Sequence, residues 1–185
     1  AETSLSIRRC WPHTVLNNNM ENQQITDSLL AQFGADAVFG IGESHGILQV
    51  TTTVETIVPM IHYLYAHPTF KFQFLTDLAG IHFPEAKGQE LGVIYHLHSL
   101  ENNVRLWIKA YAPIEAPNFP TITGLFATAN WMEREAFDFY GIIFDGHPNL
   151  TRILNMDEMD YHPMRKEYPL EDATRHDKID ELFGR

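Results

Sequence analysis

The stretch ANWMEREAFDFYGIIFDGHPNLTRILNMDEMDYHPMRKEYPL, residues 129–170, decides the fold of this chain. It opens with the features of a helix that is capped at both ends. Asn130 suits the N-cap position, and Glu133 follows three residues later, as in a capping box. Gly141 stands where a left-handed C-terminal cap is needed. The spacing therefore predicts a helix between Asn130 and Gly141.

The predicted helix has one apolar face and one charged face at the helical period. The apolar face contains Met132, Ala136, Phe139 and Tyr140, and the charged face contains Arg134, Glu135 and Asp138. Arg134 and Asp138 are spaced for an ion pair within the helix. Glu133 lies close to the apolar face, where an unpaired carboxylate is unfavourable. We therefore expect Glu133 to be satisfied by the capping box or by an arginine of this chain or of a neighbour.

The residues after Gly141 predict turns and then an extended strap, residues 146–185, which is punctuated by prolines. Between residues 146 and 170 the strap contains three cations, Arg152, Arg165 and Lys166. Fixed cations on an extended segment are suited to pairing with carboxylates on the surface of a partner. We therefore interpret residues 146–185 as a docking strap and tail.

The whole stretch resembles the signature of the thirty-kilodalton subunit of respiratory complex I, the proton-pumping NADH:quinone oxidoreductase. The pattern of that family is E-R-E, an aromatic-Asp pair, G-I, G-H-P, R-I-L and a final P-L-R-K-D-aromatic-P. In this chain the pieces are Glu133-Arg134-Glu135, Phe137-Asp138, Gly141-Ile142, Gly146-His147-Pro148, Arg152-Ile153-Leu154 and Pro163-Met164-Arg165-Lys166-Glu167-Tyr168-Pro169. Met164 replaces the usual Leu and Glu167 the usual Asp, and both changes keep size class or charge. So long an ordered match is highly specific.

The resemblance implies a non-catalytic subunit of the peripheral arm. It would brace the large subunit that helps to form the quinone site, here called the quinone-site subunit. Electrons would pass from NADH through FMN and iron–sulfur clusters of partner subunits to quinone, with no cofactor in this chain. The resemblance also implies a peripheral position on the cytoplasmic side of a bacterial inner membrane, or on the matrix side in an organelle.

The same resemblance implies which residues bind partners. They are Glu133, Arg134, Glu135, Asp138, His147, Arg152, Arg165 and Lys166. Their partners would be the quinone-site subunit and neighbouring subunits of the peripheral arm. The alternative identity for this chain is the equivalent subunit of a ferredoxin-fed complex or of a membrane-bound hydrogenase. That subunit shares much of the signature.

Composition sets independent bounds on the function. With 185 residues, of which 44% are hydrophobic, the chain is long enough for one domain with a proper core. A net charge of −11 argues against nucleic-acid binding, which needs a basic face. The single cysteine, Cys10, excludes an internal disulfide and a four-cysteine cluster supplied by this chain alone. No apolar run approaches the roughly 20 residues that span a bilayer.

Upstream of the signature, the order of elements predicts an α+β fold. Apolar periodicity predicts a helix over residues 25–33, strands over 37–41 and 47–51, a helix that starts at Thr53 and contains Pro59, and strands within 70–83, 91–97 and 104–111. A short helix is expected near Leu125-Phe126. This order is typical of a two-layer domain, residues 20–145, with helices packed on a mixed β-sheet. Residues 1–19 have no apolar periodicity, and we interpret them as a disordered N-terminal extension before Met20.

A metal-dependent enzyme is an alternative function of a different class from a subunit of a complex. His96 and His98 are two residues apart on a predicted strand, so they share a face, as in some zinc sites. No third ligand is spaced to join them, and neither G-x-S-x-G nor H-E-x-x-H occurs. The sequence therefore favours a structural role for these histidines over a free-standing metal-dependent enzyme. At position 82 the family of the resemblance usually has Asp, whereas this chain has His82.

Overall fold

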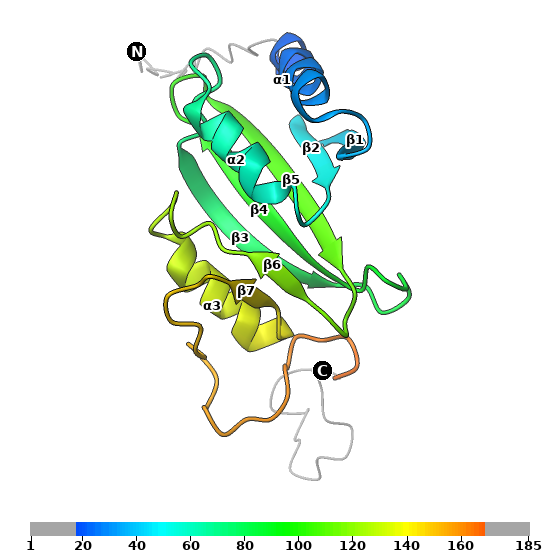
Figure 1. Cartoon of the computed structure of the whole chain (residues 1–185), viewed down its shortest axis with the longest axis vertical. Coiled ribbons are helices and arrows are strands. Elements are labelled where there is room, and N and C mark those ends of the chain that lie inside the picture. Colours follow the sequence, from blue (N-terminus) through cyan, green and yellow to red (C-terminus); the bar gives the residue numbers. More distant parts are fainter. Residues whose placement is uncertain (1–17, 169–185) are drawn as a thin grey trace, which may run out of the picture.

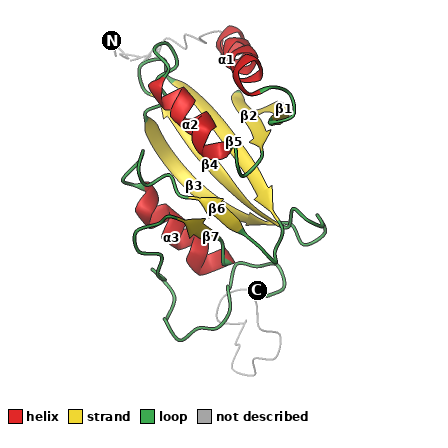
Figure 2. Ribbon diagram, viewed as in Figure 1, coloured by secondary structure: helices red, strands yellow, loops and turns green. Residues whose placement is uncertain are grey.

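A computed structural model describes residues 18–168 of the chain as an α+β domain with three helices and two sheets (Figure 1). The elements, drawn by type in Figure 2, are α1 Asn18–Phe33, β1 Val38–Ser44, β2 Ile47–Thr52, α2 Ile57–Ala66, β3 Phe74–His82, β4 Leu91–Ser99, β5 Val104–Ala112, β6 Asn118–Pro120, α3 Ala129–Tyr140 and β7 Ile143–Asp145. The expectations for residues 1–17 and 169–185 lie outside the described residues. Helix α1 begins two residues before the boundary that the sequence predicts at Met20.

The main sheet has five strands in the order β1-β2-β5-β4-β3. Strands β2 and β5 are parallel, whereas the other neighbours are antiparallel. The predicted mixed sheet is therefore confirmed. The β1–β2 hairpin turns at His45 and Gly46, with φ angles of 53° and 76°. Positive φ at both central residues gives the twist that two-residue hairpins prefer, which explains a glycine at the second of these positions.

Strict alternation along β4 and β5 separates two faces of the sheet. The side chains of Val93, Tyr95, Leu106 and Ile108 are fully buried and form the centre of the core. Their neighbours along each strand point to the opposite face, because successive side chains alternate in a strand. Helix α2 lies across the buried face (Figure 1), and its apolar residues Ile57, Met60, Ile61 and Leu64 complete the core.

The second helix begins later than the sequence predicts. Thr53 is not its cap, because the helix starts at Ile57, after Thr56. Pro59 then lies in the first turn, where proline costs no intrahelical hydrogen bond. The expected short helix near Leu125-Phe126 is a pair of turns instead.

A second, two-stranded parallel sheet joins β6 to β7 and positions the last helix. The sequence does not predict this pairing, because each strand has only three residues. Helix α3 lies against the edge strand β3, where the Tyr140 ring occupies the space that a side chain at Gly80 would fill. A Cβ atom at Gly80 would lie 2.5 Å from Tyr140 Cδ2. None of the helices within residues 18–168 has the length and apolar character to span a bilayer.

Two tyrosines allow a matched test of the core. The Tyr95 hydroxyl is buried without a hydrogen-bond partner among the described residues, whereas the Tyr63 hydroxyl lies 2.6 Å from Ser28 Oγ. We predict that Tyr95→Phe keeps or raises the free energy of unfolding by about 0–1 kcal/mol, because it removes an unsatisfied group. Tyr63→Phe should lower it by about 1 kcal/mol. Urea unfolding of both variants checks this, and a large loss for Tyr95→Phe would contradict the core as described.

Candidate functional site

The signature residues meet around one buried carboxylate, that of Asp138 in α3. Asp138 Oδ1 accepts hydrogen bonds from Arg152 Nη1 at 2.7 Å and from Asn155 Nδ2 at 3.0 Å. Asp138 Oδ2 accepts from the backbone N–H groups of Ile153, Leu154 and Asn155 at 2.8–3.1 Å. The Asp138 side chain has no solvent exposure. The residues R-I-L-N therefore wrap around one carboxylate and fix the start of the strap on α3.

This set of donors sets the protonation state of Asp138. Burial alone would raise the pKa of the carboxyl group. The N–H groups of Asn155 and Leu154 and the side chains of Arg152 and Asn155 outweigh burial and hold the pKa well below its ordinary value. Asp138 is therefore ionised throughout the physiological range and forms a buried ion pair with Arg152.

Arg152 also connects distant parts of the strap. Its Nη1 donates to the Asp138 carbonyl oxygen at 3.1 Å, and its Nη2 donates to the carbonyl oxygens of Met159 and Tyr161 at 2.7 and 3.0 Å. One planar guanidinium thus joins α3 to both arms of the loop between residues 152 and 161, a geometry that lysine cannot provide.

The C-terminus of α3 is held by the next part of the strap. Gly141 ends the helix with φ of 74° and donates its N–H to the Phe137 carbonyl oxygen at 2.8 Å, so the predicted left-handed cap is confirmed. Arg165 Nε donates to the Tyr140 carbonyl oxygen at 2.8 Å. His162 covers the glycine so closely that a Cβ atom there would lie 2.6 Å from its ring. Only glycine fits this position, for conformational and for steric reasons.

Glu133 is fully buried, but its partners differ from those that the sequence predicts. Its two oxygens accept hydrogen bonds from Thr121 Oγ1 at 2.6 Å and from the Ile122 N–H at 2.8 Å. The expected capping box at Asn130 is wrong, because α3 begins at Ala129 and no side chain caps it. Burial raises the pKa of Glu133 against these two hydrogen bonds. Its role is to hold the segment after β6 against α3.

Arg134 and His147 tie neighbouring loops to the same helix. Arg134 donates to the carbonyl oxygens of Thr151 and Arg152 at 3.0 and 2.9 Å, so the predicted pair with Asp138 within the helix does not form. His147 Nδ1 accepts from the Asn149 N–H at 3.0 Å, which leaves Nε2 as the donor to the Asn130 carbonyl oxygen at 3.1 Å.

His82, at the end of β3, anchors the last described part of the strap. It is 5% exposed, and its Nδ1 accepts the Lys166 N–H at 2.9 Å. Burial lowers the pKa of His82, Arg165 and Lys166 lower it further, and Glu167 and Glu90 oppose them. An aspartate at this position would also be an acceptor. His82 therefore supplies an equivalent contact with a group that titrates nearer neutral pH.

Two of the three strap cations are thus internal braces. Arg152 and Arg165 donate to groups of their own domain, and Asp138, which the helical period places on a charged outer face, is instead buried. The physical reason is that the strap folds back over α3, so its cations meet groups of their own domain. Lys166 and Glu135 are exposed, and their roles in partner binding stay predictions, as does that of His147.

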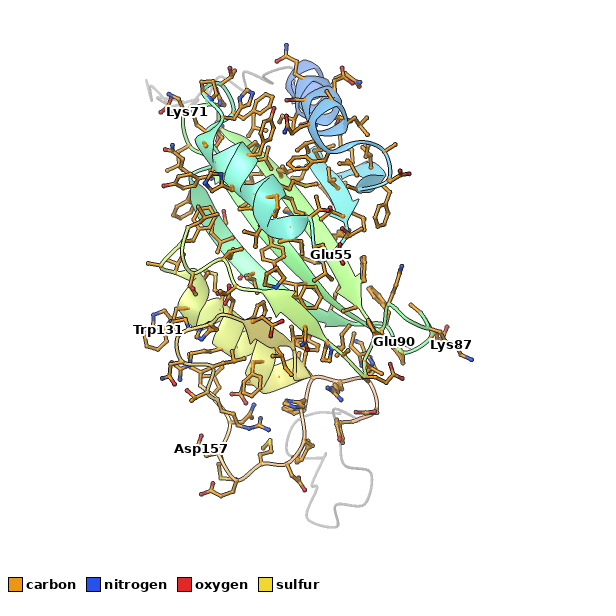
Figure 3. The ribbon with its side chains drawn as sticks, viewed as in Figure 1. Glu55, Lys71, Lys87, Glu90, Trp131 and Asp157 are labelled. Carbon is orange, nitrogen blue, oxygen red and sulfur yellow. The ribbon has the colours of Figure 1, made fainter. Side chains whose placement is uncertain are left out.

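The described part of the strap exposes several large apolar side chains among its charged ones. We define the strap surface by large apolar side chains that are 39–69% exposed: Trp131 of α3, and Leu154, Met156, Tyr161, Met164 and Tyr168 of the strap. Figure 3 shows Trp131 pointing away from the body of the domain and Asp157 at the far end of the strap loop. Several exposed large apolar side chains on one pinned segment are typical of a binding surface. The sequence contains this signal in Leu154, Met156 and Met164, but the charges of the strap are more conspicuous and dominate the prediction.

The histidines of the predicted metal alternative contact aromatic rings. The His96 ring lies 4.8 Å from the Trp107 ring, and the His98 ring lies 6.4 Å from the Phe74 ring. Within residues 18–168 there is no group of three or more His, Cys, Asp or Glu residues placed to hold a metal ion.

The fold and this site define a class of protein. Its members have an α+β domain in which the signature side chains fix an extended strap, with exposed apolar side chains, on the last helix. Residues 50–174, more than half of the chain, match the family described as respiratory-chain NADH dehydrogenase, 30 Kd subunit. The chain belongs to this family, that of the thirty-kilodalton subunit of complex I.

Individual relatives agree with this assignment. The C 2 subunit of the NADH-quinone oxidoreductase of Rhizobium meliloti (strain 1021) is 43% identical over 144 residues, which are 77% of this chain and 77% of that protein. A solved structure described as Nqo5 of the trypsin-resistant fragment (1-134) has a TM-score of 0.57 at 30% identity and covers 69% of this chain and 98% of that one. A chain of the membrane-bound sulfane sulfur reductase, an archaeal respiratory membrane complex, shares the fold, with a TM-score of 0.65 at 19% identity over 81% of this chain and 86% of that one.

The two buried carboxylates of α3 give a matched prediction. Asp138→Asn should lower the free energy of unfolding by about 3–5 kcal/mol, because it leaves Arg152 without its buried partner. Glu133→Gln should change it by less than about 1 kcal/mol, because an amide can both donate to Thr121 and accept from Ile122. Urea unfolding at pH 7 measures both values. Because the pKa of Asp138 is depressed, wild-type stability should also fall below about pH 4, and more steeply than that of Asp138→Asn.

A second prediction concerns His82 and pH. Its lowered folded pKa means that the Lys166 contact is complete above about pH 6.5 and is lost as pH falls through the folded value. The hydrogen-exchange protection factor of the Lys166 amide should therefore drop as the pH is lowered below about 6.5. In His82→Asn, Oδ1 accepts without titrating, so protection should stay constant. His162 does not confound the test, because its Nδ1 donates to the Asp138 carbonyl oxygen and keeps that proton when the ring is charged. Equal pH dependence in both proteins would contradict the role of His82.

Proposed function

We propose that this chain is a non-catalytic peripheral-arm subunit of a proton-translocating NADH:quinone oxidoreductase, and that it braces the quinone-site subunit. The complex would pass electrons from NADH through FMN and iron–sulfur clusters of partner subunits to quinone. The chain would lie on the cytoplasmic side of a bacterial inner membrane, or on the matrix side in an organelle. Membership of the thirty-kilodalton subunit family and a relative named as the C 2 subunit of NADH-quinone oxidoreductase support this proposal.

The observation that carries the bracing role is the pinned strap. The strap is tied to α3 through Asp138, to the end of that helix through Arg165, and to β3 through Lys166 and His82. A segment fixed in advance loses little conformational entropy when it binds, which favours tight association. Its outward side chains include apolar and aromatic ones, which are enriched at the centre of protein interfaces.

The cofactor assignment follows from stoichiometry. An iron–sulfur cluster needs four ligands, most often cysteine thiolates, and this chain has one cysteine. We therefore propose that the clusters lie in partner subunits, and the resemblance to the family implies the same for the flavin. The strap surface instead gives this chain a positioning task, which is to hold the partner that binds quinone in its working geometry.

Two exposed leucines test the docking role as a matched pair. Leu154 lies in the strap and is 68% exposed, whereas Leu100 lies in the β4–β5 turn and is 66% exposed. We predict that Leu154→Asp reduces co-purification of the chain with the quinone-site subunit at least tenfold, because it places a charge in an apolar interface. Leu100→Asp should leave co-purification unchanged. Both variants should keep the unfolding free energy of the isolated chain within about 0.5 kcal/mol, as is usual for surface sites.

The measurement is a tagged pull-down from cells that express the complex, with quantitative mass spectrometry of the quinone-site subunit and NADH:quinone activity of the eluate. The backbone N–H of Leu154 still reaches Asp138 in the variant, so the strap itself stays in place. Normal recovery of an active complex with Leu154→Asp would overturn the bracing role of the strap.

A further inference from the structure

The main sheet has a second face, which is separate from the strap. We define the outer face by the side chains of β4 and β5 that alternate with the core: Ile94, His96, Arg105, Trp107, Lys109 and Tyr111. Each of these residues keeps solvent exposure, while the side chains between them on both strands are buried. Helix α2 lies on the opposite side of the sheet (Figure 1). Among residues 18–168, the outer face is therefore without a covering layer.

The composition of the outer face differs from that of a solvated sheet. An antiparallel sheet that faces water alternates apolar with polar residues. Here Trp107 and Tyr111 stand on β5 and Ile94 on β4, in positions that would otherwise suit polar residues. The Tyr111 ring lies 6.3 Å from the ring of Phe83, which is itself 50% exposed. Tryptophan, tyrosine and arginine together on one face are the residues enriched at interface hot spots.

The charge of the outer face is opposite to that of the chain. The whole chain has a net charge of −11, yet the charged residues that β4 and β5 present on this face are Arg105 and Lys109. Lys109 Nζ lies 2.6 Å from Gln49 Oε1 of β2, so no carboxylate of the described residues neutralises it through an ion pair. The same face also carries Asp77 of the edge strand β3, which is in register with His96 of β4 and accepts a hydrogen bond from the backbone N–H of Leu78. A cationic and aromatic surface on an acidic protein is complementary to an acidic ligand.

We propose that the outer face docks a segment of a neighbouring subunit in which carboxylates stand among apolar side chains. The apolar side chains would pack on Trp107 and Tyr111, and the carboxylates would pair with Arg105 and Lys109. This inference rests on the proposed function, because it needs a multi-subunit complex. It adds a second docking surface, of different chemistry from the strap surface and on a different element of the fold.

Amine labelling of Lys109 tests the proposal, with Lys87 as the control. Lys87 lies in the exposed β3–β4 loop, away from the body of the domain (Figure 3). We expect acetylation of Lys109 by an N-hydroxysuccinimide ester to be at least tenfold slower in the assembled complex than in the isolated full chain, while Lys87 reacts equally in both. Carbodiimide treatment of the complex should then join Lys109 to an Asp or Glu of another subunit, identified by mass spectrometry of the cross-linked peptide.

A charge-reversal pair gives a second measurement. The double variant Arg105→Glu and Lys109→Glu should weaken incorporation of the chain at least tenfold and make it less sensitive to salt. Lys87→Glu should have no effect. Circular dichroism of the isolated variants confirms that each one is folded, which separates loss of docking from loss of structure.

Each outcome decides between specific alternatives. Equal labelling of Lys109 in the complex and in the isolated chain overturns the proposal, as does a cross-link to residues 169–185 of the same chain or to a second copy. A chain that does not co-purify with the complex overturns the proposed function, and this inference falls with it. A chain that co-purifies with a freely labelled Lys109 overturns this inference alone.

Discussion

The buried ion pair between Asp138 and Arg152 is the interaction on which the rest of the site depends. Removing two charges from water carries a penalty of several kcal/mol for each ion, which attraction offsets only when further hydrogen bonds satisfy the remaining atoms. Here the Asp138 carboxylate accepts five hydrogen bonds and the Arg152 guanidinium also reaches two strap carbonyl oxygens. Such a pair adds less to net stability than to geometry. It specifies where the strap crosses α3, and hence which side chains the strap presents to a partner.

The two buried carboxylates of α3 show how different surroundings shift the pKa of the same chemical group in opposite directions. Glu133 meets two neutral donors, and burial raises its pKa. Asp138 meets a cation and three backbone N–H groups besides the Asn155 amide, and its pKa falls. Both lie on one helix, five residues apart in the sequence. The difference is that the strap returns over Asp138, while Glu133 faces the short segment after β6. The ionised Asp138 fixes the strap, whereas Glu133 holds the segment after β6 through contacts that a neutral amide can also make.

The sequence predicts the elements that depend on local patterns. It does not predict the contacts that form when a later segment folds back over an earlier helix. Alternation reveals β4 and β5, and Gly141 reveals the end of α3, because each signal lies within a few residues. A helical wheel places Asp138 opposite the apolar face and therefore toward solvent. The wheel contains no information about a segment that folds back from residue 152, fourteen positions later, and covers that side. Because the sequence does not show that the strap folds back, it also suggests that Arg152 and Arg165 are free to bind a partner.

The correction changes the chemistry expected of the docking strap without removing the strap from the interface. Arg152 and Arg165 both donate hydrogen bonds inside the domain, so the charges of the strap have a structural role beside any role in binding a partner. Burial of apolar area can supply attraction to a partner, at about 25 cal/mol per Å², and the exposed side chains of Leu154, Met156 and Tyr161 offer that area. Charge acts at an earlier stage, because it fixes the strap before the strap binds. A rigid apolar strap binds with less entropic loss than a flexible charged one. On the proposed function, the internal ion pair would therefore favour association by fixing the strap in advance.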